Sequence, residues 1–362
     1  MATDTATDKV QVWELPRSSD LMRFGPVEAA VTVARLVEGK GDPALLEPGL
    51  ADRLAVGHLR VQDWDAEHVV LDPVTGRLSS LWLYEERPDL STLRELAPSP
   101  AALGRLLGAV EDLGAFRGRF AELAGQWGPA AVARAETVFR SVLAEEDWGP
   151  GGIPRFWELS AVIRPLSLIA GPGAGLRLEL PGALLAEEFG ADGVVRVDPA
   201  RLPAGLVHEP TRRFLAAVGL PRDGGMFYLD GPEELLTPFA EEGPEIPGAN
   251  TRALFSLGGL VEDTSVYVDG VTGAVHAWYH GYGSLVPLNS DVSTLAFTLW
   301  LYRREQALEE VHGFTDGLYG QLADAMVDVL AAVDPVPGRA TDDEDDWHYW
   351  PQVFHDEAGG VL

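Results

Sequence analysis

Two distant stretches of the sequence have the same pattern: Val69-Val70-Leu71-Asp72-Pro73-Val74-Thr75-Gly76-Arg77 and Tyr267-Val268-Asp269-Gly270-Val271-Thr272-Gly273-Ala274. In each, an alternating apolar run leads to an aspartate, a turn closes on Thr-Gly, and a second run follows that ends on a tryptophan, Trp82 or Trp278. An aspartate side chain can accept hydrogen bonds from its own backbone two residues on, and glycine supplies the positive φ with which the chain re-enters the ladder. The sequence therefore predicts the same β-hairpin twice.

The segments that follow the two hairpins also correspond. Ser99 precedes a helical phrase over 100–107, and Leu288-Asn289-Ser290-Asp291 precedes another over 292–301. Both begin with a polar residue that can accept a hydrogen bond from an unpaired N–H of the first helical turn. A second helical stretch and a tryptophan come later in each copy. These parallels predict a tandem duplication of one module; the alternative is that Asp-x-x-Thr-Gly hairpins simply recur in mixed proteins.

The length of the chain, 362 residues, exceeds the size at which a single hydrophobic core keeps growing, so two domains are expected. The best boundary is a run rich in glycine and proline over 148–154. We therefore place a first module at 1–148, a linker at 149–175, and a second module with an acidic and aromatic tail at 176–362.

Hydrophobic periodicity places individual elements along the chain. Apolar residues at helical spacing predict an amphipathic helix over 26–38 and a short helix over 182–189. Alternating apolar residues predict strands over 54–61 and 176–181, and a further strand over 254–258 precedes the second hairpin.

The charge balance narrows the range of partners. The chain has 27 Lys and Arg against 56 Asp and Glu, a net charge of −29. Such a surface repels phosphate backbones and anionic lipids, so we expect neither nucleic-acid nor membrane binding, and it favours cationic partners. The alternative is that the acidic residues serve solubility alone, as in acidic proteomes.

Other features of composition exclude further classes. There is no cysteine, which excludes disulfides and thiolate metal sites. The N-terminal residues lack a basic start and an apolar core, and no apolar run approaches the roughly 18 residues that cross a bilayer. We expect a soluble, cytoplasmic protein.

A search for catalytic and cofactor motifs is negative. P-loop, His-Glu-x-x-His and Gly-x-Ser-x-Gly patterns are absent, and the glycines over 171–175 lack the spacing of a dinucleotide fingerprint. His276 and His280 would share one face of a strand, where they could bind a metal ion. Histidines that are solvated or packed on aromatic rings are a simpler interpretation. The acidic run over 342–346 lacks the glycine turn of a calcium loop. We predict no catalytic, cofactor or metal residues.

One segment has the composition of a contact surface. Aromatic residues flanked by glycines over 278–284 offer flat area of the kind that anchors interfaces, and the first copy lacks such a segment. The alternative for Trp278 and Tyr279 is packing in the core or at a sheet edge. The predicted partner-binding residues are Trp278, Tyr279, His280, Tyr282, His276, Asp342, Asp343, Asp345, Asp346 and Trp347.

The order of helix, Gly-Leu-Pro, variable loop, strands, Asp-x-x-Thr-Gly hairpin and Leu-Asn-Ser-Asp resembles the SUKH superfamily, most closely its SUKH-4-type branch. The residues that carry the resemblance lie at 214–221, 266–275 and 288–301. It covers about residues 205 to 333 well and is weak over 25–145. The resemblance implies an α+β fold, here as two similar SUKH-like modules, each a twisted antiparallel sheet backed by helices.

The resemblance also implies a bacterial immunity protein, which binds and neutralises a toxin, often a nuclease. The family has no shared catalytic set, so no residue role is carried over. The first hypothesis is therefore a binding protein whose acidic, aromatic-bearing surface covers a basic protein toxin or another cationic partner. The alternative is an enzyme or small-molecule-binding protein that uses a groove between the modules, with His276, His280 and Tyr282 as acid/base groups. No oligomeric state follows from the sequence.

Overall fold

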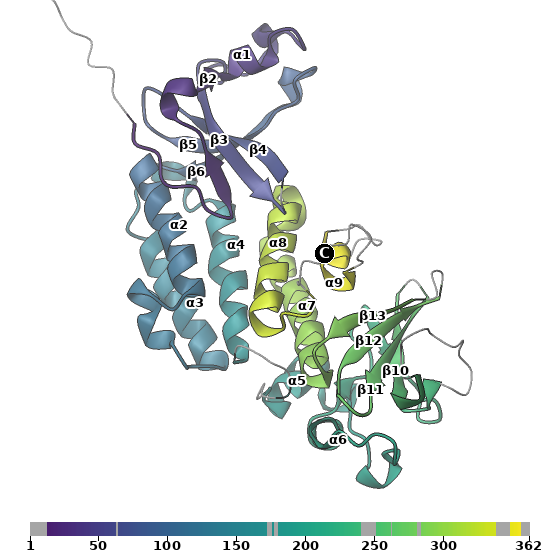
Figure 1. Cartoon of the computed structure of the whole chain (residues 1–362). Coiled ribbons are helices and arrows are strands. Elements are labelled where there is room, and N and C mark those ends of the chain that lie inside the picture. The colour runs from purple at the N-terminus through teal and green to yellow at the C-terminus, as the bar shows by residue number, and fades with distance from the viewer. Residues whose placement is uncertain are drawn as a thin grey trace, which may run out of the picture. The chain divides into compact units, whose positions relative to one another are not determined.

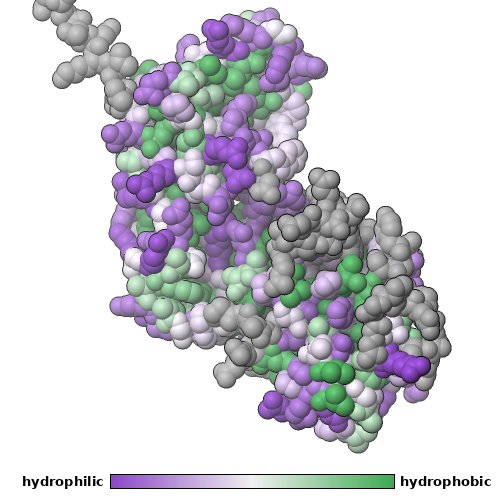
Figure 2. All heavy atoms as spheres, in the orientation of Figure 1, coloured by the Kyte–Doolittle hydropathy of each residue, from purple (hydrophilic) through white to green (hydrophobic). Residues whose placement is uncertain are grey.

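The computed structural model shows an α+β protein with antiparallel sheets (Figure 1). The chain divides into two compact units, which we call the N-terminal unit (Met1–Arg119 and Val138–Glu158) and the C-terminal unit (Phe120–Thr137 and Leu159–Leu362). Hydrophilic side chains cover much of the surface in view, with apolar ones between them (Figure 2). The predicted boundaries at 148 and 176 stay a prediction. The structure describes residues 13–62, 64–171, 176, 180–239, 251–261, 263–280, 284–337 and 348–355.

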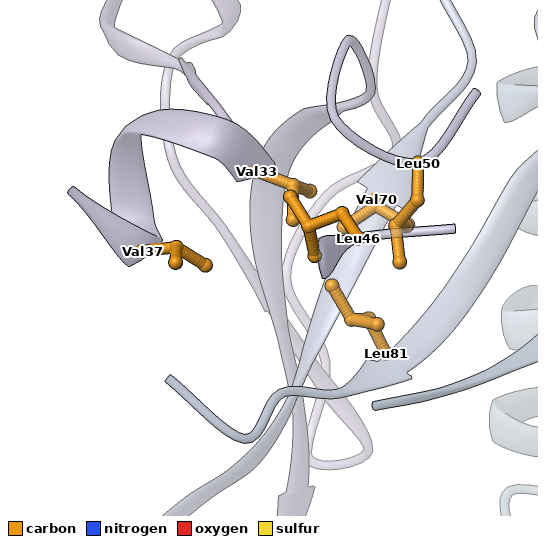
Figure 3. Close-up of a cluster of buried hydrophobic side chains, with 6 residues drawn as sticks. All are labelled: Val33, Val37, Leu46, Leu50, Val70 and Leu81. Atoms are coloured by element: carbon orange, nitrogen blue, oxygen red, sulfur yellow. The ribbon is translucent and has the colours of Figure 1, made fainter. Parts of the chain in front are cut away.

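The N-terminal unit contains one antiparallel sheet with the strand order β1-β3-β4-β5-β6, and β2 also pairs with β3. One face of this sheet is closed by buried side chains from the preceding segment of the chain: Val33, Val37, Leu46 and Leu50 pack on Val70 and Leu81 (Figure 3). Its strands are β1 (Met22–Phe24), β2 (Val31–Thr32), β3 (Leu54–Val61), β4 (Trp64–Leu71), β5 (Leu78–Trp82) and β6 (Thr92–Ala97).

The helix predicted over 26–38 is wrong in its first half. A 3-10 turn is followed by β2, which pairs with β3, and only Val33–Val37 form a helix, α1. Both residues of β2, Val31 and Thr32, are β-branched and suit an edge strand, and Thr32 then caps α1 by accepting a hydrogen bond from the Arg35 N–H. Pairing with a distant strand outweighs the local helical spacing.

Part of the segment that the sequence predicts as a linker, 149–171, is helical. After a 3-10 turn at Gly149–Gly151 it forms α4 (Arg155–Ile163) and a 3-10 helix at Arg164–Ile169. Trp157 is fully buried, and its indole N–H donates to the Leu96 carbonyl at 2.6 Å. The run of glycines and prolines, which disfavour helix, ends at Pro154, and the apolar residues that follow have helical spacing. The glycine and proline signal therefore marks a turn that precedes a buried helix.

Helices α2 (Pro100–Gly114) and α3 (Pro129–Leu143) lie where helical phrases are expected. The Ser99 hydroxyl caps α2 by accepting from the Ala102 N–H at 3.1 Å, as the sequence predicts. The other 3-10 helices of the described residues are η1 (Val27–Ala29), η2 (Pro43–Leu45), η3 (Pro88–Leu90), η4 (Gly118–Leu123), η7 (Ala191–Gly193), η8 (Pro199–Arg201) and η10 (Thr251–Ala253).

The C-terminal unit contains a sheet with the order β13-β12-β11-β10-β9, and a small ladder of β7 with β8. The predicted strand at 254–258 and helix at 182–189 are confirmed, whereas the strand expected at 176–181 lies largely outside the described residues. The elements are α5 (Gly182–Phe189), β7 (Val194–Val195), α6 (Glu209–Ala217), β8 (Leu220–Pro221), β9 (Phe227–Leu229), β10 (Leu254–Leu260), β11 (Thr264–Asp269), β12 (Val275–Tyr279), β13 (Ser284–Asn289), α7 (Val292–His312), α8 (Thr315–Val333) and α9 (Tyr349–Phe354).

The first half of α7 is the centre of the C-terminal core. Every residue from Val292 to Tyr302 is buried, so this stretch has no solvent-exposed face. A helix that is buried on all sides must be surrounded by other elements, and α5, α6, α8 and β13 all contact α7. The helix begins at a capping box, in which the Asp291 carboxylate accepts from the Ser293 and Thr294 N–H groups at 2.7 and 3.1 Å.

The two predicted hairpin turns are confirmed and have the same hydrogen bonds. Asp72 Oδ1 accepts from the N–H groups two and three residues on at 2.9 and 3.0 Å, and Asp269 Oδ1 does so at 2.7 and 2.9 Å. Gly76 and Gly273 close the turns at φ values of +76° and +83°. Each turn joins corresponding strands, β4 to β5 and β11 to β12.

Both sheets also shift register at corresponding places. Where β3 pairs with β4 and β10 pairs with β11, the register shifts just before Gly57 and just before Gly258. Where β5 pairs with β6 and β12 pairs with β13, the register shifts between the first two residues of β5 and of β12. A Cβ atom on Gly57 would lie 2.2 Å from the Arg23 oxygen of edge strand β1, and one on Gly258 would lie 2.0 Å from the Tyr228 oxygen of edge strand β9. The two sheets are therefore built on one plan.

Candidate partner-binding face

Strand pairing separates the two faces of the C-terminal sheet. Val266, Val268, Val275 and Ala277 lie on the inner face and have no exposed surface. The opposite side, which we call the outer face, is defined by cross-strand partners that point the same way. The members of the outer face are Tyr228, Ser265, Tyr267, His276, Trp278 and Leu285.

A buried aromatic cluster supports the outer face. Phe239 packs edge-on against Tyr267 and Trp278, with ring centroids 4.8 and 5.6 Å apart. Phe239 and Trp278 are only 5% and 4% exposed, and Leu254 completes the cluster. Trp278 thus packs in a core cluster, the alternative that the sequence leaves open for it, and holds its neighbours in place.

The solvent-facing part of the outer face comes from other side chains. Tyr228 of β9 is 52% exposed, and Tyr267, His276 and Leu285 are partly exposed around the aromatic cluster. The sequence prediction missed Tyr228, because its strand has only three residues and its place beside β10 depends on Gly258. It also passed over Tyr267, although this residue stands inside the repeated hairpin.

The two histidines of the predicted site differ in environment. Burial lowers the pKa of His276, which favours the neutral imidazole, and the nearby Asp269 charge opposes this only in part. His280 is exposed, and its Nε2 lies 2.9 Å from the Ser265 hydroxyl oxygen. Its ring centroid lies 6.4 Å from that of Trp278. Across the residues that the structure describes, no group of three or more acidic or histidine side chains could hold a metal ion.

The remaining predicted site residues do not join this arrangement. Tyr279 pairs with the buried Thr264 and alternates with Trp278 along β12, so it lies on the inner side of the sheet. The other six predicted residues lie outside the described residues and stay a prediction: Tyr282, Asp342, Asp343, Asp345, Asp346 and Trp347.

The Leu-Asn-Ser-Asp motif has a structural role. Asn289, 1% exposed, donates from Nδ2 to Asp334 Oδ2 at 3.0 Å and to Thr298 Oγ1 at 3.1 Å. Its Oδ1 accepts from the Trp350 indole N–H at 3.1 Å. Ser290 also donates to the fully buried Asp334, from its N–H at 2.9 Å and its hydroxyl at 2.6 Å. This network joins the end of β13 to α7, to the end of α8 and to α9.

Together, these elements define an α+β module whose antiparallel sheet has a buried inner face and an outer face lined by aromatic and imidazole side chains. The model of the SUKH-4 immunity protein family matches residues 180–356, which include this sheet and its helices. The resemblance to the SUKH-4-type branch that the sequence indicates is therefore confirmed over this part of the chain. A match to an immunity protein family implies a toxin as the binding partner.

Two other comparisons give no match: the chain is similar to no curated protein and to no solved structure. None of the helices in the described part of the chain combines the length and the apolar character that a membrane span requires. The family match therefore indicates an immunity-type protein, and the outer face is the candidate surface for its partner.

Proposed function

We propose that the protein neutralises a toxin by binding it with the outer face of the C-terminal sheet. The observation that carries this proposal is the set of partly exposed side chains, Tyr228, Tyr267 and His276, over a buried aromatic support. Aromatic side chains bury a large area with few rotatable bonds, and a rigid support lowers the entropy cost of ordering them. Such a surface suits binding to a protein.

The corresponding face of the N-terminal unit supports placing the function in the C-terminal unit. At the same distances from the hairpin aspartate, Tyr267 is replaced by Val70 and Trp278 by Leu81. Val70 and Leu81 are fully buried under side chains of their own unit (Figure 3). This face of the N-terminal sheet therefore has no comparable surface to offer a partner.

We further propose that the two predicted modules, 1–148 and 176–362, arose by tandem duplication. The shared hydrogen bonds of the Asp72 and Asp269 turns, the matching register shifts, and the capped helix after the last strand all support it. In this account, the N-terminal copy lost the aromatic residues and covered the equivalent face with α1 and η2.

The charge of the chain favours a basic toxin, such as a nuclease. With a net charge of −29, the protein attracts cationic surfaces over distances set by the ionic strength. A nuclease needs cationic side chains to hold the phosphates of its substrate. An acidic partner that covers these side chains both binds them and blocks access of the substrate.

Co-purification with the product of the adjacent gene tests the proposal. The wild-type chain should retain that protein and protect cells that produce it. The double variant Tyr228→Ala/Tyr267→Ala should weaken the complex by about tenfold or more, since truncated aromatic anchors typically cost 2 kcal/mol or more. Trp64→Ala is the matched control, because Trp64 is 66% exposed but belongs to the N-terminal unit. Failure of the wild-type chain to bind or protect refutes the proposal.

A further inference from the structure

A pocket of the C-terminal unit concentrates arginines in an otherwise acidic chain. It has a volume of about 190 Å³ and lies between the segment after β7, the end of β8 and the turn that follows β9. Arg196, Arg201 and Arg222 line it, together with Asp198 and Asp230. The other lining residues are apolar, apart from backbone groups.

The three arginines have unused donors. None of them forms an ion pair with a residue that the structure describes, although the chain has 56 acidic residues against 27 basic ones. Arg196 donates from Nε to the Ala217 carbonyl at 3.0 Å, and Arg201 donates from Nη2 to the Pro232 carbonyl. The guanidinium of Arg222 has no hydrogen-bond partner among the described residues. Each guanidinium has five N–H donors, so most donors of these three arginines can bind a ligand.

The two acidic groups of the pocket are engaged elsewhere. Asp198 Oδ1 accepts from the Ala200 N–H at 2.9 Å and caps the short helix η8. Asp230 accepts a hydrogen bond from the Ser256 hydroxyl, and burial raises the pKa of Asp230. Even with both carboxylates ionised, three guanidiniums against two carboxylates leave the pocket with a net positive charge.

We infer that this pocket binds a small phosphate-bearing anion through Arg196, Arg201 and Arg222. Guanidinium groups match the spacing of phosphate oxygens and bind them with paired hydrogen bonds. Three guanidiniums offer more donors than the two oxygens of a carboxylate can accept, which favours a phosphate. The three arginines are exposed, so an anion can reach them from solvent, and apolar neighbours such as Val195 and Leu235 complete the lining.

The size of the pocket limits the ligand. Sites for drug-sized molecules have volumes of about 300–1,000 Å³, so about 190 Å³ suits free phosphate or a short phosphate monoester. The overall negative charge does not prevent binding, because charges more than about 8–10 Å away are largely screened at physiological salt. None of the lining residues of this pocket is a member of the outer face, and the test of phosphate binding does not depend on a toxin.

Calorimetric titration of the full chain with inorganic phosphate tests the inference, with sodium chloride at matched ionic strength as the reference titrant. We expect saturable phosphate binding with a Kd tighter than about 10 mM. Arg222→Gln should weaken it by about tenfold, since hydrogen bonds to charged groups contribute that much. Arg222→Lys keeps the charge but loses the paired donors, so it should recover only part of the affinity. Tighter binding of glycerol phosphate would identify a monoester as the ligand.

Arg213→Gln is the control, because Arg213 is exposed on α6 of the same unit and does not line the pocket. It removes the same charge from the chain and should leave phosphate binding unchanged. Thermal unfolding of each variant establishes that it is folded. The inference is overturned if the wild-type chain shows no saturable phosphate binding, or if Arg213→Gln and Arg222→Gln weaken it equally.

Discussion

Glu305 of α7 is 1% exposed, and neither of its carboxylate oxygens has a hydrogen-bond partner among the described residues. Burial, and secondly the charge of Glu309, raise the pKa of Glu305 to about 8. The side chain is therefore protonated at neutral pH, which avoids a buried and uncompensated charge. At the scale of single residues, this carboxyl group couples stability to pH.

The free energy of unfolding should fall as pH rises because of Glu305. In the unfolded chain the group ionises above an ordinary pKa of 4.5, whereas in the folded chain it stays protonated until about pH 8. Between these values the unfolded state loses the proton first and gains stability, by up to about 1.4 kcal/mol per pH unit. Glu305→Gln removes this dependence, so its stability relative to the wild type should increase with pH.

Denaturant unfolding between pH 5 and about pH 8 measures this difference. Glu310→Gln is the control, because Glu310 lies on the same helix but is exposed. It should keep the wild-type dependence on pH. A constant difference between Glu305→Gln and the wild type over this range would show that Glu305 ionises normally in the folded protein.

At the scale of elements, the glycines that precede the hairpins let each edge strand approach. We predict that Gly57→Ala and Gly258→Ala each destabilise the chain by about 1–3 kcal/mol, because the new Cβ would meet a carbonyl oxygen of β1 or β9. Gly108→Ala in α2, where nothing lies within 4 Å of the added atom, should instead stabilise by about 0.5–1 kcal/mol. The shift of the unfolding midpoint measures all three. Unchanged stability of both strand variants would contradict the shared plan of the sheets.

The network around Asn289 should hold α9 to the rest of the C-terminal unit. Asn289→Ala leaves Asp334 and the Trp350 indole N–H with fewer partners and should cost about 2–4 kcal/mol. Trp350→Phe removes the indole donor together with part of a buried ring, and the cycle separates these two losses. In a double-mutant cycle, the two changes should show a coupling of about 0.5–1.5 kcal/mol in the free energy of unfolding. Additive effects would mean that the Asn289 to Trp350 bond does not stabilise α9.

The sequence predicts those elements whose chemistry is local. The Asp72 and Asp269 turns and the caps at Ser99 and Asp291 each depend on a few neighbouring residues, and all are confirmed. The helix over 26–38 is wrong because the pairing of Val31 with Ala55 is not local.

The candidate site could be predicted only in part, for the same reason. The hairpin signals locate the strand of His276 and Trp278, but the burial of Trp278 depends on Phe239, which is far away in the sequence. The arginine pocket has no motif, because Arg196, Arg201 and Arg222 come from separate segments that meet only in the folded chain.

At the scale of the whole molecule, the net charge of −29 should control how fast a basic toxin associates. We predict that the association rate constant falls by roughly tenfold or more between low and physiological salt, while the dissociation rate changes little. Stopped-flow or surface-based kinetics at several salt concentrations measure both constants. An association rate that is independent of salt would mean that the acidic residues serve solubility alone.

Calorimetric titration of the purified full chain with the toxin encoded beside it shows whether the outer face of the C-terminal sheet binds that toxin. We predict a saturable complex that Tyr228→Ala/Tyr267→Ala weakens by about tenfold or more and that Trp64→Ala leaves unchanged. An unaltered affinity in the double variant, or a larger loss in Trp64→Ala, would contradict the assignment of the toxin-binding surface to the outer face of the C-terminal sheet.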